Sequence, residues 1–155
     1  MGRPVCSTLS LTIRKAKSDA EIADAAELYE RSGTQAFTWR PVGHFQARDF
    51  IAFAQEEEVW LAYTSDALVG ILSLFKEESF IHCLYVEPEA QGLGIGKALV
   101  DFVRKKIGKP LTLKLDVPNR KAIAFYDATG WQRMTGLDDQ GIDDMGIKWA
   151  RYRLP

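Results

Sequence analysis

Seven stretches of the chain carry the alternating or continuous apolar pattern that is typical of β-strands. Three of them follow one another with only short polar turns between, which predicts an antiparallel meander. The last two flank a loop rich in aspartate, which predicts a closing pair of strands. The predicted strands are 9–16, 59–65, 68–77, 79–88, 111–117, 131–136 and 147–154.

Apolar residues at helical spacing predict four helices between these strands. The first begins with a capping box, because Ser18 stands three residues before Glu21, and Gly33 predicts its end. The last begins after Asn119, a residue type preferred at helix N-caps, and Gly130 predicts its end. The predicted helices are 18–33, 46–58, 94–108 and 119–130.

The order of these elements, β-α-α-β-β-β-α-β-α-β-β, predicts a mixed α/β fold with helices on both faces of one sheet. The chain has 155 residues, a length typical of a single domain. We therefore expect one domain over residues 1–155, with residues 1–8 as a flexible tail.

Composition narrows the classes of function. The net charge of −1 argues against a general nucleic-acid binder. Two cysteines, Cys6 and Cys83, are too few for a disulfide framework or a four-thiolate metal site, and no metal site is predicted. No apolar run approaches the roughly 20 residues of a membrane span, and no signal-peptide pattern opens the chain. We therefore expect a cytoplasmic protein without a membrane segment.

The segment EPEAQGLGIGKAL, residues 87–99, places three glycines at alternate positions between an apolar run and a helical pattern. Bare backbone followed by a helix N-terminus favours an anionic ligand. A phosphate-binding P-loop is improbable because Ala98 stands where that motif requires a hydroxyl. A dinucleotide-binding loop lacks its third glycine, although Asp116 lies at the spacing of a ribose-binding acid. A dinucleotide-dependent enzyme therefore stays as the weaker alternative.

A third loop pattern fits in every position. Gln91-x-x-Gly94-x-Gly96 resembles the [QR]-x-x-G-x-[GA] loop of the GNAT superfamily of acyl-CoA-dependent N-acetyltransferases. A second stretch, residues 115–131, resembles that family's other signature: a strand, an asparagine, a tyrosine seven residues later and a glycine–aromatic pair. The order of the predicted elements is also similar to that of the family over nearly the whole chain.

The resemblance implies a fold and an activity. The fold is a central mixed sheet of about seven mostly antiparallel strands, flanked by four helices and splayed open between 80–86 and 111–117. The activity is transfer of an acetyl group from acetyl-CoA to a primary amine, by direct attack in a ternary complex and without a metal. A catalytically silent domain that binds acyl-CoA as a sensor or structural module is the alternative.

By resemblance, acetyl-CoA is the co-substrate, and the glycine loop holds its pyrophosphate through main-chain N–H groups that lead into a helix. The pantetheine arm is expected along the strand that ends at Val86, where a main-chain N–H would face the thioester oxygen. Arg120 and Lys121 are candidates for the 3′-phosphate. The expected cofactor-binding residues are Leu84, Tyr85, Val86, Gln91, Gly92, Leu93, Gly94, Ile95, Gly96, Lys97, Asn119, Lys121 and Tyr126.

Amide formation requires a deprotonated amine and protonation of the leaving thiolate. The resemblance implies that Tyr126 is the acid that protonates the thiolate. The base is open between His82, Glu87, Asp116 and a chain of water molecules. Only the histidine side chain ordinarily titrates near neutral pH. Strand alternation places His82 on the face of Leu84 and Glu87 on the opposite face, so at most one of the two points directly at the acceptor.

The resemblance places the acceptor between the connection of the first two helices and the hairpin near the C-terminus. Phe37 and Trp39 stand in that connection, and the loop 137–146 carries four aspartates. Aromatic rings and acids could cradle a cationic amine, but a packed loop beside a solvated acidic turn explains the same residues. We expect a small-molecule or peptide amine as acceptor and no nucleic acid, and the resemblance also allows a homodimer.

Overall fold

The structure is a computed structural model that describes residues 10–155. The predicted tail, residues 1–8, lies outside the described residues. Within the described part of the chain, no helix is long and apolar enough to cross a membrane. The elements are β1 (Leu11–Lys15), α1 (Asp19–Ala36), α2 (Ala47–Ala54), β2 (Glu58–Thr64), β3 (Ala67–Phe75), β4 (Phe80–Val86), α3 (Ile95–Ile107), β5 (Leu111–Asp116), α4 (Arg120–Ala128), β6 (Gln132–Arg133), β7 (Gln140–Ile142) and β8 (Lys148–Leu154).

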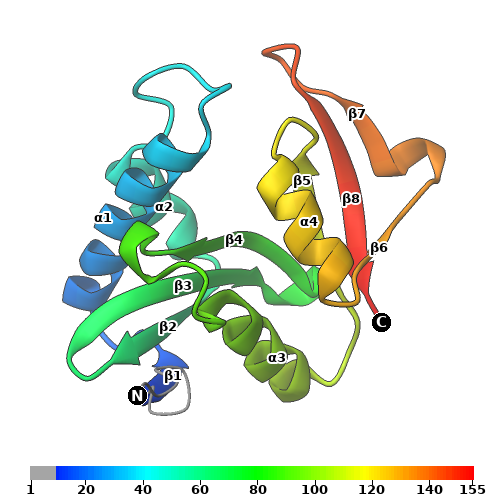
Figure 1. The fold of residues 1–155 in the computed structure, drawn as a ribbon. Coiled ribbons are helices and arrows are strands. Elements are labelled where there is room, and N and C mark those ends of the chain that lie inside the picture. Colours follow the sequence, from blue (N-terminus) through cyan, green and yellow to red (C-terminus); the bar gives the residue numbers. More distant parts are fainter. Residues whose placement is uncertain (1–9) are drawn as a thin grey trace, which may run out of the picture.

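One sheet runs through the molecule (Figure 1). Its described residues form eight strands in the order β1-β2-β3-β4-β5-β8-β6, with β7 paired to β8. The pair β4–β5 is parallel and every other pair is antiparallel. The predicted fold, a mostly antiparallel mixed sheet with four flanking helices, is confirmed. A doubly wound parallel sheet, which the dinucleotide alternative needs, is excluded.

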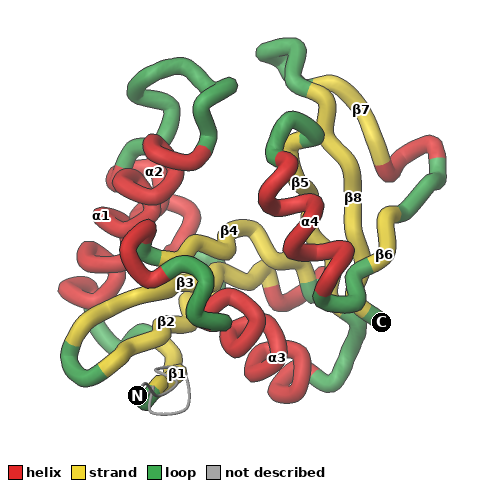
Figure 2. Tube along the Cα trace, viewed as in Figure 1, coloured by secondary structure: helices red, strands yellow, loops and turns green. Residues whose placement is uncertain are grey.

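The helices cover both faces of the sheet, as the tube view also shows (Figure 2). Helices α1 and α2 pack on one face around the buried residues Phe50, Leu61 and Ile71. Helices α3 and α4 pack on the other face, around Leu99 and Tyr152. Burial of these side chains is the main contribution to the stability of the fold, at roughly 25 cal/mol per Å² of apolar surface.

Helix α1 begins as predicted and ends later. The Glu21 N–H donates to the Ser18 hydroxyl at 3.2 Å, as in a capping box. The helix passes Gly33 and continues to Ala36, so the predicted end was wrong. Gly33 has a different role, because a Cβ at this position would lie 2.6 Å from the Phe45 ring. The glycine lets the α1–α2 connection fold back onto α1.

Two further boundaries differ from the prediction. Helix α2 ends at Ala54 rather than at residue 58, and a turn leads from it into β2. The aspartate-rich loop contains a short strand, β7, which pairs with β8 through Gln140 and Ala150. Strand β7 raises the number of strands from about seven to eight.

Strand β4 contains a β-bulge at the point where it leaves β5. Ser73 of β3 pairs with Cys83, and Leu74 pairs with Ile81, so His82 is the extra residue. The pairing of β4 with β5 is limited to Phe80 with Thr112 and Ile81 with Leu113. A bulge bends the strand that carries it and increases its local twist. Beyond the bulge the two strands diverge, as expected for residues 80–86 and 111–117.

Candidate active site

A cleft of about 1130 Å³ lies where β4 and β5 diverge. It extends from the glycine loop to the α1–α2 connection, and α4 forms part of its wall. Leu93 and Glu87 were predicted in the site but do not line the cleft. The predicted residues that do line it are Phe37, Trp39, His82, Leu84, Tyr85, Val86, Gln91, Gly92, Gly94, Ile95, Gly96, Lys97, Asp116, Asn119, Arg120, Lys121 and Tyr126.

The glycine loop has the backbone geometry of an anion site. Gly92 and Gly94 both have φ of +84°, a left-handed conformation that favours glycine. A Cβ on either residue would meet no atom within 4 Å, so the need for glycine comes from the backbone and not from packing. The N–H groups of residues 92–97 donate to no described residue. They stand at the N-terminal end of α3, where a negative charge is stabilised.

The side of β4 that faces away from β3 carries main-chain N–H groups beyond Ile81 that pair with no described strand. The Glu87 N–H donates to the Val69 carbonyl at 2.8 Å, toward β3. By strand alternation the N–H groups of Val86 and Leu84 face the diverging side. The Val86 carbonyl accepts hydrogen bonds from the Ser32 hydroxyl and the Gln91 amide, each at 3.2 Å. An extended ligand could therefore pair with β4 in place of β5.

Tyr126 reaches the cleft from α4. Its ring packs between Phe125 and Trp131, with centroids 5.0 and 5.2 Å away. Its hydroxyl makes no hydrogen bond to the described residues. Burial raises the pKa of Tyr126 above its ordinary value, so the phenol stays protonated and can donate a proton or a hydrogen bond. Asn119 caps α4, because its side chain accepts from the Ala122 N–H at 3.1 Å.

His82 lies on the α2 side of β4. Its ring lies 4.2 Å from the Phe53 ring, and its Nδ1 lies 2.8 Å from a Glu57 carboxylate oxygen. Strand alternation predicted that His82 shares the face of Leu84, which packs on the α3 side. That assignment was wrong because the bulge turns two consecutive side chains, His82 and Cys83, to the α1–α2 side.

The other two predicted bases are bound by arginines. Glu87 accepts from Arg31 through both carboxylate oxygens, at 2.9 and 2.6 Å. Asp116 accepts from Arg40 through both oxygens, at 3.0 and 2.9 Å, and from the Trp39 indole N–H at 2.8 Å. Both oxygens of each carboxylate are thus occupied by hydrogen bonds from the protein's own arginine. Of the three, His82 has a ring nitrogen that contacts no described partner.

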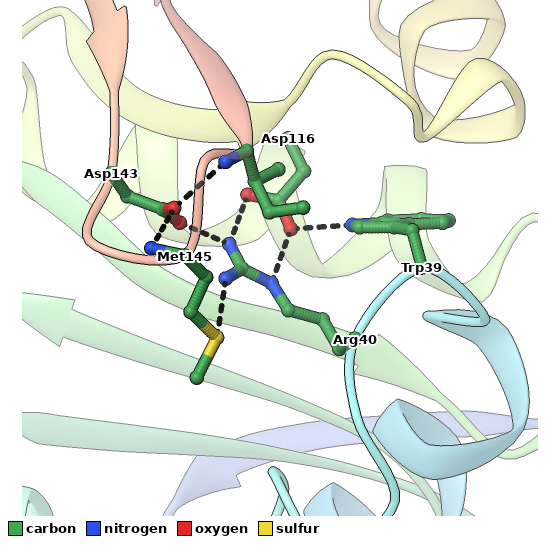
Figure 3. Close-up of polar contacts among 6 residues, drawn as sticks. Trp39, Arg40, Asp116, Asp143 and Met145 are labelled. Atoms are coloured by element: carbon green, nitrogen blue, oxygen red, sulfur yellow. Dashed lines mark hydrogen bonds and ion pairs between the residues drawn. The ribbon is translucent and has the colours of Figure 1, made fainter.

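Arg40 joins the two walls of the cleft (Figure 3). Besides Asp116 on β5, it binds Asp143 in the β7–β8 hairpin at 2.8 Å. Its guanidinium also lies 3.6 Å from the Met145 sulfur. Burial lowers the pKa of Arg40, but the hydrogen bonds to Asp116 and Asp143 outweigh burial and raise it overall. The charge of Arg40 is therefore permanent.

Of the two explanations left open for the aspartate-rich loop, this arrangement favours the packed loop over an acidic cradle for the acceptor. Asp143 is bound by the protein's own Arg40, and its pKa is lowered by the Ile147 N–H and by Arg40. Asp139 pairs with Arg151 at 3.3 Å. The aromatic part of the expectation fits the structure, because Phe37 and Trp39 both line the cleft.

A match to a family model decides the family of this chain. Residues 22–131 match the model described as the acetyltransferase (GNAT) family. The chain belongs to the GNAT acetyltransferase family. The predicted resemblance is confirmed, and so is the prediction that the protein is an acyltransferase enzyme.

Curated relatives agree with membership in the GNAT family, and a solved structure agrees in fold. The chain is 33% identical over 103 residues to the peptidyl-lysine N-acetyltransferase YjaB of Salmonella typhimurium, covering 66% of this chain and 67% of the relative. It is 31% identical over 138 residues to the peptidyl-lysine N-acetyltransferase YiaC of Escherichia coli, covering 81% and 90%. The fold is similar, with a TM-score of 0.72 and 18% identity, to the PaiA N-acetyltransferase of Thermoplasma acidophilum in complex with coenzyme A. That similarity covers 92% of this chain and 98% of the other.

The residues of this GNAT protein fit acetyl-CoA, the donor expected from the family. The free N–H groups of residues 92–97 suit a pyrophosphate, and the open side of β4 suits an extended arm. Lys97 lies in the same loop and is paired with Asp101 at 2.7 Å on the surface of α3. Lys121 is exposed at the start of α4 and is free to reach a phosphate.

Sequence reasoning missed three residues of the site. Arg40 contacts Asp116 across 76 residues of chain. Glu57 contacts His82 across 25 residues, and Ser32 contacts Val86 across 54. No spacing rule connects partners so far apart. A charged residue in an otherwise aromatic connection was the one available signal for Arg40.

Proposed function

We propose that this protein transfers the acetyl group of acetyl-CoA to the side-chain amine of a lysine in a peptide or protein. The observation that carries the proposal is that His82 and Tyr126 line the same cleft, one from each diverging half of the sheet. One supplies an imidazole for the amine proton, and the other supplies a phenol for the thiolate.

The donor would be held by the glycine loop and the open side of β4. The N–H groups of residues 92–97 would bind the pyrophosphate, and the Val86 N–H would stabilise the negative charge that develops on the thioester oxygen. Lys121 is the candidate for the 3′-phosphate. Acetyl-CoA supplies an activated acetyl thioester, and every other contribution comes from side chains of this protein.

The acceptor amine must lose a proton to attack, because an ammonium ion has no lone pair. His82 Nε2 accepts this proton, while the amine nitrogen bonds to the acetyl carbon. As the carbon–sulfur bond breaks, the Tyr126 hydroxyl donates its proton to the departing sulfur. As the amide forms, its nitrogen loses a second proton, and this proton restores the Tyr126 phenol. The products are an acetylated amine and CoA thiol, and the proton on His82 leaves to solvent.

Two observations support a lysine side chain as the acceptor. Both curated relatives are named peptidyl-lysine N-acetyltransferases. Aromatic rings also line the acceptor half of the cleft, where Phe37 lies 5.0 Å from Trp39 and 5.8 Å from Tyr85. An aromatic wall suits the aliphatic stem of a lysine, and the ring faces attract its cationic end.

Release of CoA thiol from acetyl-CoA tests the proposal across lysine peptides, free amino acids and small amines. We expect saturable turnover with lysine peptides and intersecting initial-rate lines, as a ternary complex requires. Turnover with small amines but not with lysine peptides would mean that the acceptor is a small-molecule amine. Silence across the panel despite acetyl-CoA binding would favour the sensor alternative, and silence without binding would remove the donor assignment. Tyr126→Phe is the control that separates enzymatic turnover from spontaneous thioester hydrolysis.

A further inference from the structure

Glu57 contacts His82 from outside the cleft. It stands in the turn between α2 and β2, its side chain is only 10% exposed, and it does not line the cleft. One carboxylate oxygen lies 2.8 Å from His82 Nδ1. The other accepts a hydrogen bond from the hydroxyl of Ser73, which is fully buried on β3. The three residues form a chain that runs from the core to the cleft.

We infer that Glu57 is a positioning residue that holds neutral His82 in the Nδ1–H tautomer, with the Nε2 lone pair directed to the acceptor. This inference rests on the proposed function, in which His82 Nε2 accepts the proton of the amine. A carboxylate accepts hydrogen bonds only, so the nitrogen that faces Glu57 must carry the hydrogen. The other nitrogen is then the basic one.

Ser73 fixes Glu57 in turn. Because the Ser73 hydroxyl is buried and donates to one carboxylate oxygen, the carboxylate cannot rotate away from His82 without leaving a buried donor unpaired. The Phe53 ring packs 4.2 Å from the imidazole and restricts its rotation as well. The base is therefore oriented before the acceptor arrives.

The tautomer can be measured without an acceptor. The chain has two histidines, His44 and His82, so their ring nitrogens can be resolved in long-range ¹H–¹⁵N spectra. At a pH where both rings are neutral, we expect His82 as the Nδ1–H tautomer. His44, whose ring nitrogens contact no described residue, serves as the internal control and is expected in the Nε2–H form that free histidine favours.

Variants separate the effect of Glu57 on the His82 tautomer from a general effect on the fold. Glu57→Ala should return His82 to the Nε2–H form, and Ser73→Ala should produce a mixture. Glu56→Ala is the matched control, because Glu56 is exposed beside Glu57 and forms no described ion pair. If Glu57→Ala fails to fold, the wild-type spectrum still decides, because it shows directly which nitrogen of His82 carries the hydrogen. An Nε2–H tautomer in the wild type, or an unchanged one in folded Glu57→Ala, would overturn the inference.

Kinetics test whether Glu57 acts through His82. With a lysine peptide as acceptor, Glu57→Ala should lower kcat about tenfold and leave KM for acetyl-CoA unchanged. The loss in kcat is smaller than the 10²-fold or more that a general base contributes, because His82 itself is still present. In a His82→Ala background it should have no further effect, since the two changes remove one function. Full additivity would overturn the positioning role. Absence of turnover with every amine would overturn the proposed function alone, because the tautomer measurement needs no acceptor.

Discussion

Arg40 donates two hydrogen bonds to Asp116 across 76 residues of sequence. The side chains are 11% and 14% exposed, so the pair is largely removed from water. Arg40 belongs to the α1–α2 connection and Asp116 to the end of β5, on opposite sides of the cleft. The residue predicted as a possible base is therefore part of a bridge between the walls.

Replacement of Arg40 should destabilise the fold and loosen the acceptor half of the cleft. Arg40→Ala leaves Asp116 and Asp143 without their cation, and loss of one partner of a buried pair costs about 3 kcal/mol. We expect a lower Tm, a higher KM for the acceptor and an unchanged affinity for acetyl-CoA. Calorimetry and initial rates measure these three quantities. In a double-mutant cycle, Arg40→Ala with Asp116→Asn should cost less than the sum of the single changes, and simple additivity would contradict the pair.

Tyr126→Phe should lower turnover without weakening the donor complex. The ring keeps its packing, and the hydroxyl forms no hydrogen bond to the described residues whose loss would destabilise the fold. We expect kcat to fall about 10²-fold, the usual contribution of a general acid. Titration calorimetry with acetyl-CoA checks that affinity is retained. An equal kcat in the variant and the wild type would remove Tyr126 from catalysis.

Gly94→Ala should weaken acetyl-CoA binding, whereas the same substitution at a left-handed glycine outside the loop should lower stability alone. A left-handed residue other than glycine costs about 1–2 kcal/mol, and relaxation would turn N–H groups away from the anion. Loss of one charge-assisted hydrogen bond, about 1.5 kcal/mol, corresponds to roughly tenfold weaker binding. Gly108→Ala is the matched control, because φ there is +70° and Gly108 lies at the other end of α3. Equal loss of affinity in both variants would contradict the role of the loop.

Glu21 makes part of the stability dependent on pH. Its hydrogen bond with Arg14, first among several contacts, lowers the pKa of Glu21 to about 2. Because this is below the ordinary value of about 4.3, the stabilisation is complete above about pH 5 and is lost as the pH falls toward 2. Glu21→Gln should lower the free energy of unfolding by up to about 1 kcal/mol at pH 7 and by only a small part of that near pH 2, where the carboxylate is half protonated. Thermal unfolding across this range measures the difference, and a constant difference at all pH values would contradict it.

The order of the elements could be predicted from the sequence because each core helix and strand carries its own apolar period. Apolar residues at helical spacing in α1 and α3 are buried at Ala25, Tyr29, Leu99 and Val103, although Phe102 of the same α3 pattern is exposed. Strand β7 was not predicted, since three residues are too few to show a period. The end of α1 was misplaced because Gly33 serves a contact with Phe45, 12 residues further along the chain, and not a local turn.

The glycine loop could be predicted for a similar reason: its residues are contiguous. The partners of His82, Glu87 and Asp116 could not, because Glu57, Arg31 and Arg40 come from other elements. The bulge also has no local signature in the sequence, and it reverses the face on which His82 lies. The homodimer and the cytoplasmic location stay predictions.

A short register between β4 and β5 joins the two halves of the molecule. Its two paired positions, which end at Ile81 and Leu113, form a hinge. The contact of Arg40 with Asp116 joins the two halves again where they have diverged. A slight rotation of one half about this hinge produces a larger displacement of its residues that lie far from the hinge. Because His82 and Tyr126 lie on different halves, a rotation that changes the width of the acceptor half also changes the distance between these two side chains. We therefore expect substitutions at the Arg40–Asp116 pair to alter acceptor selectivity and turnover together.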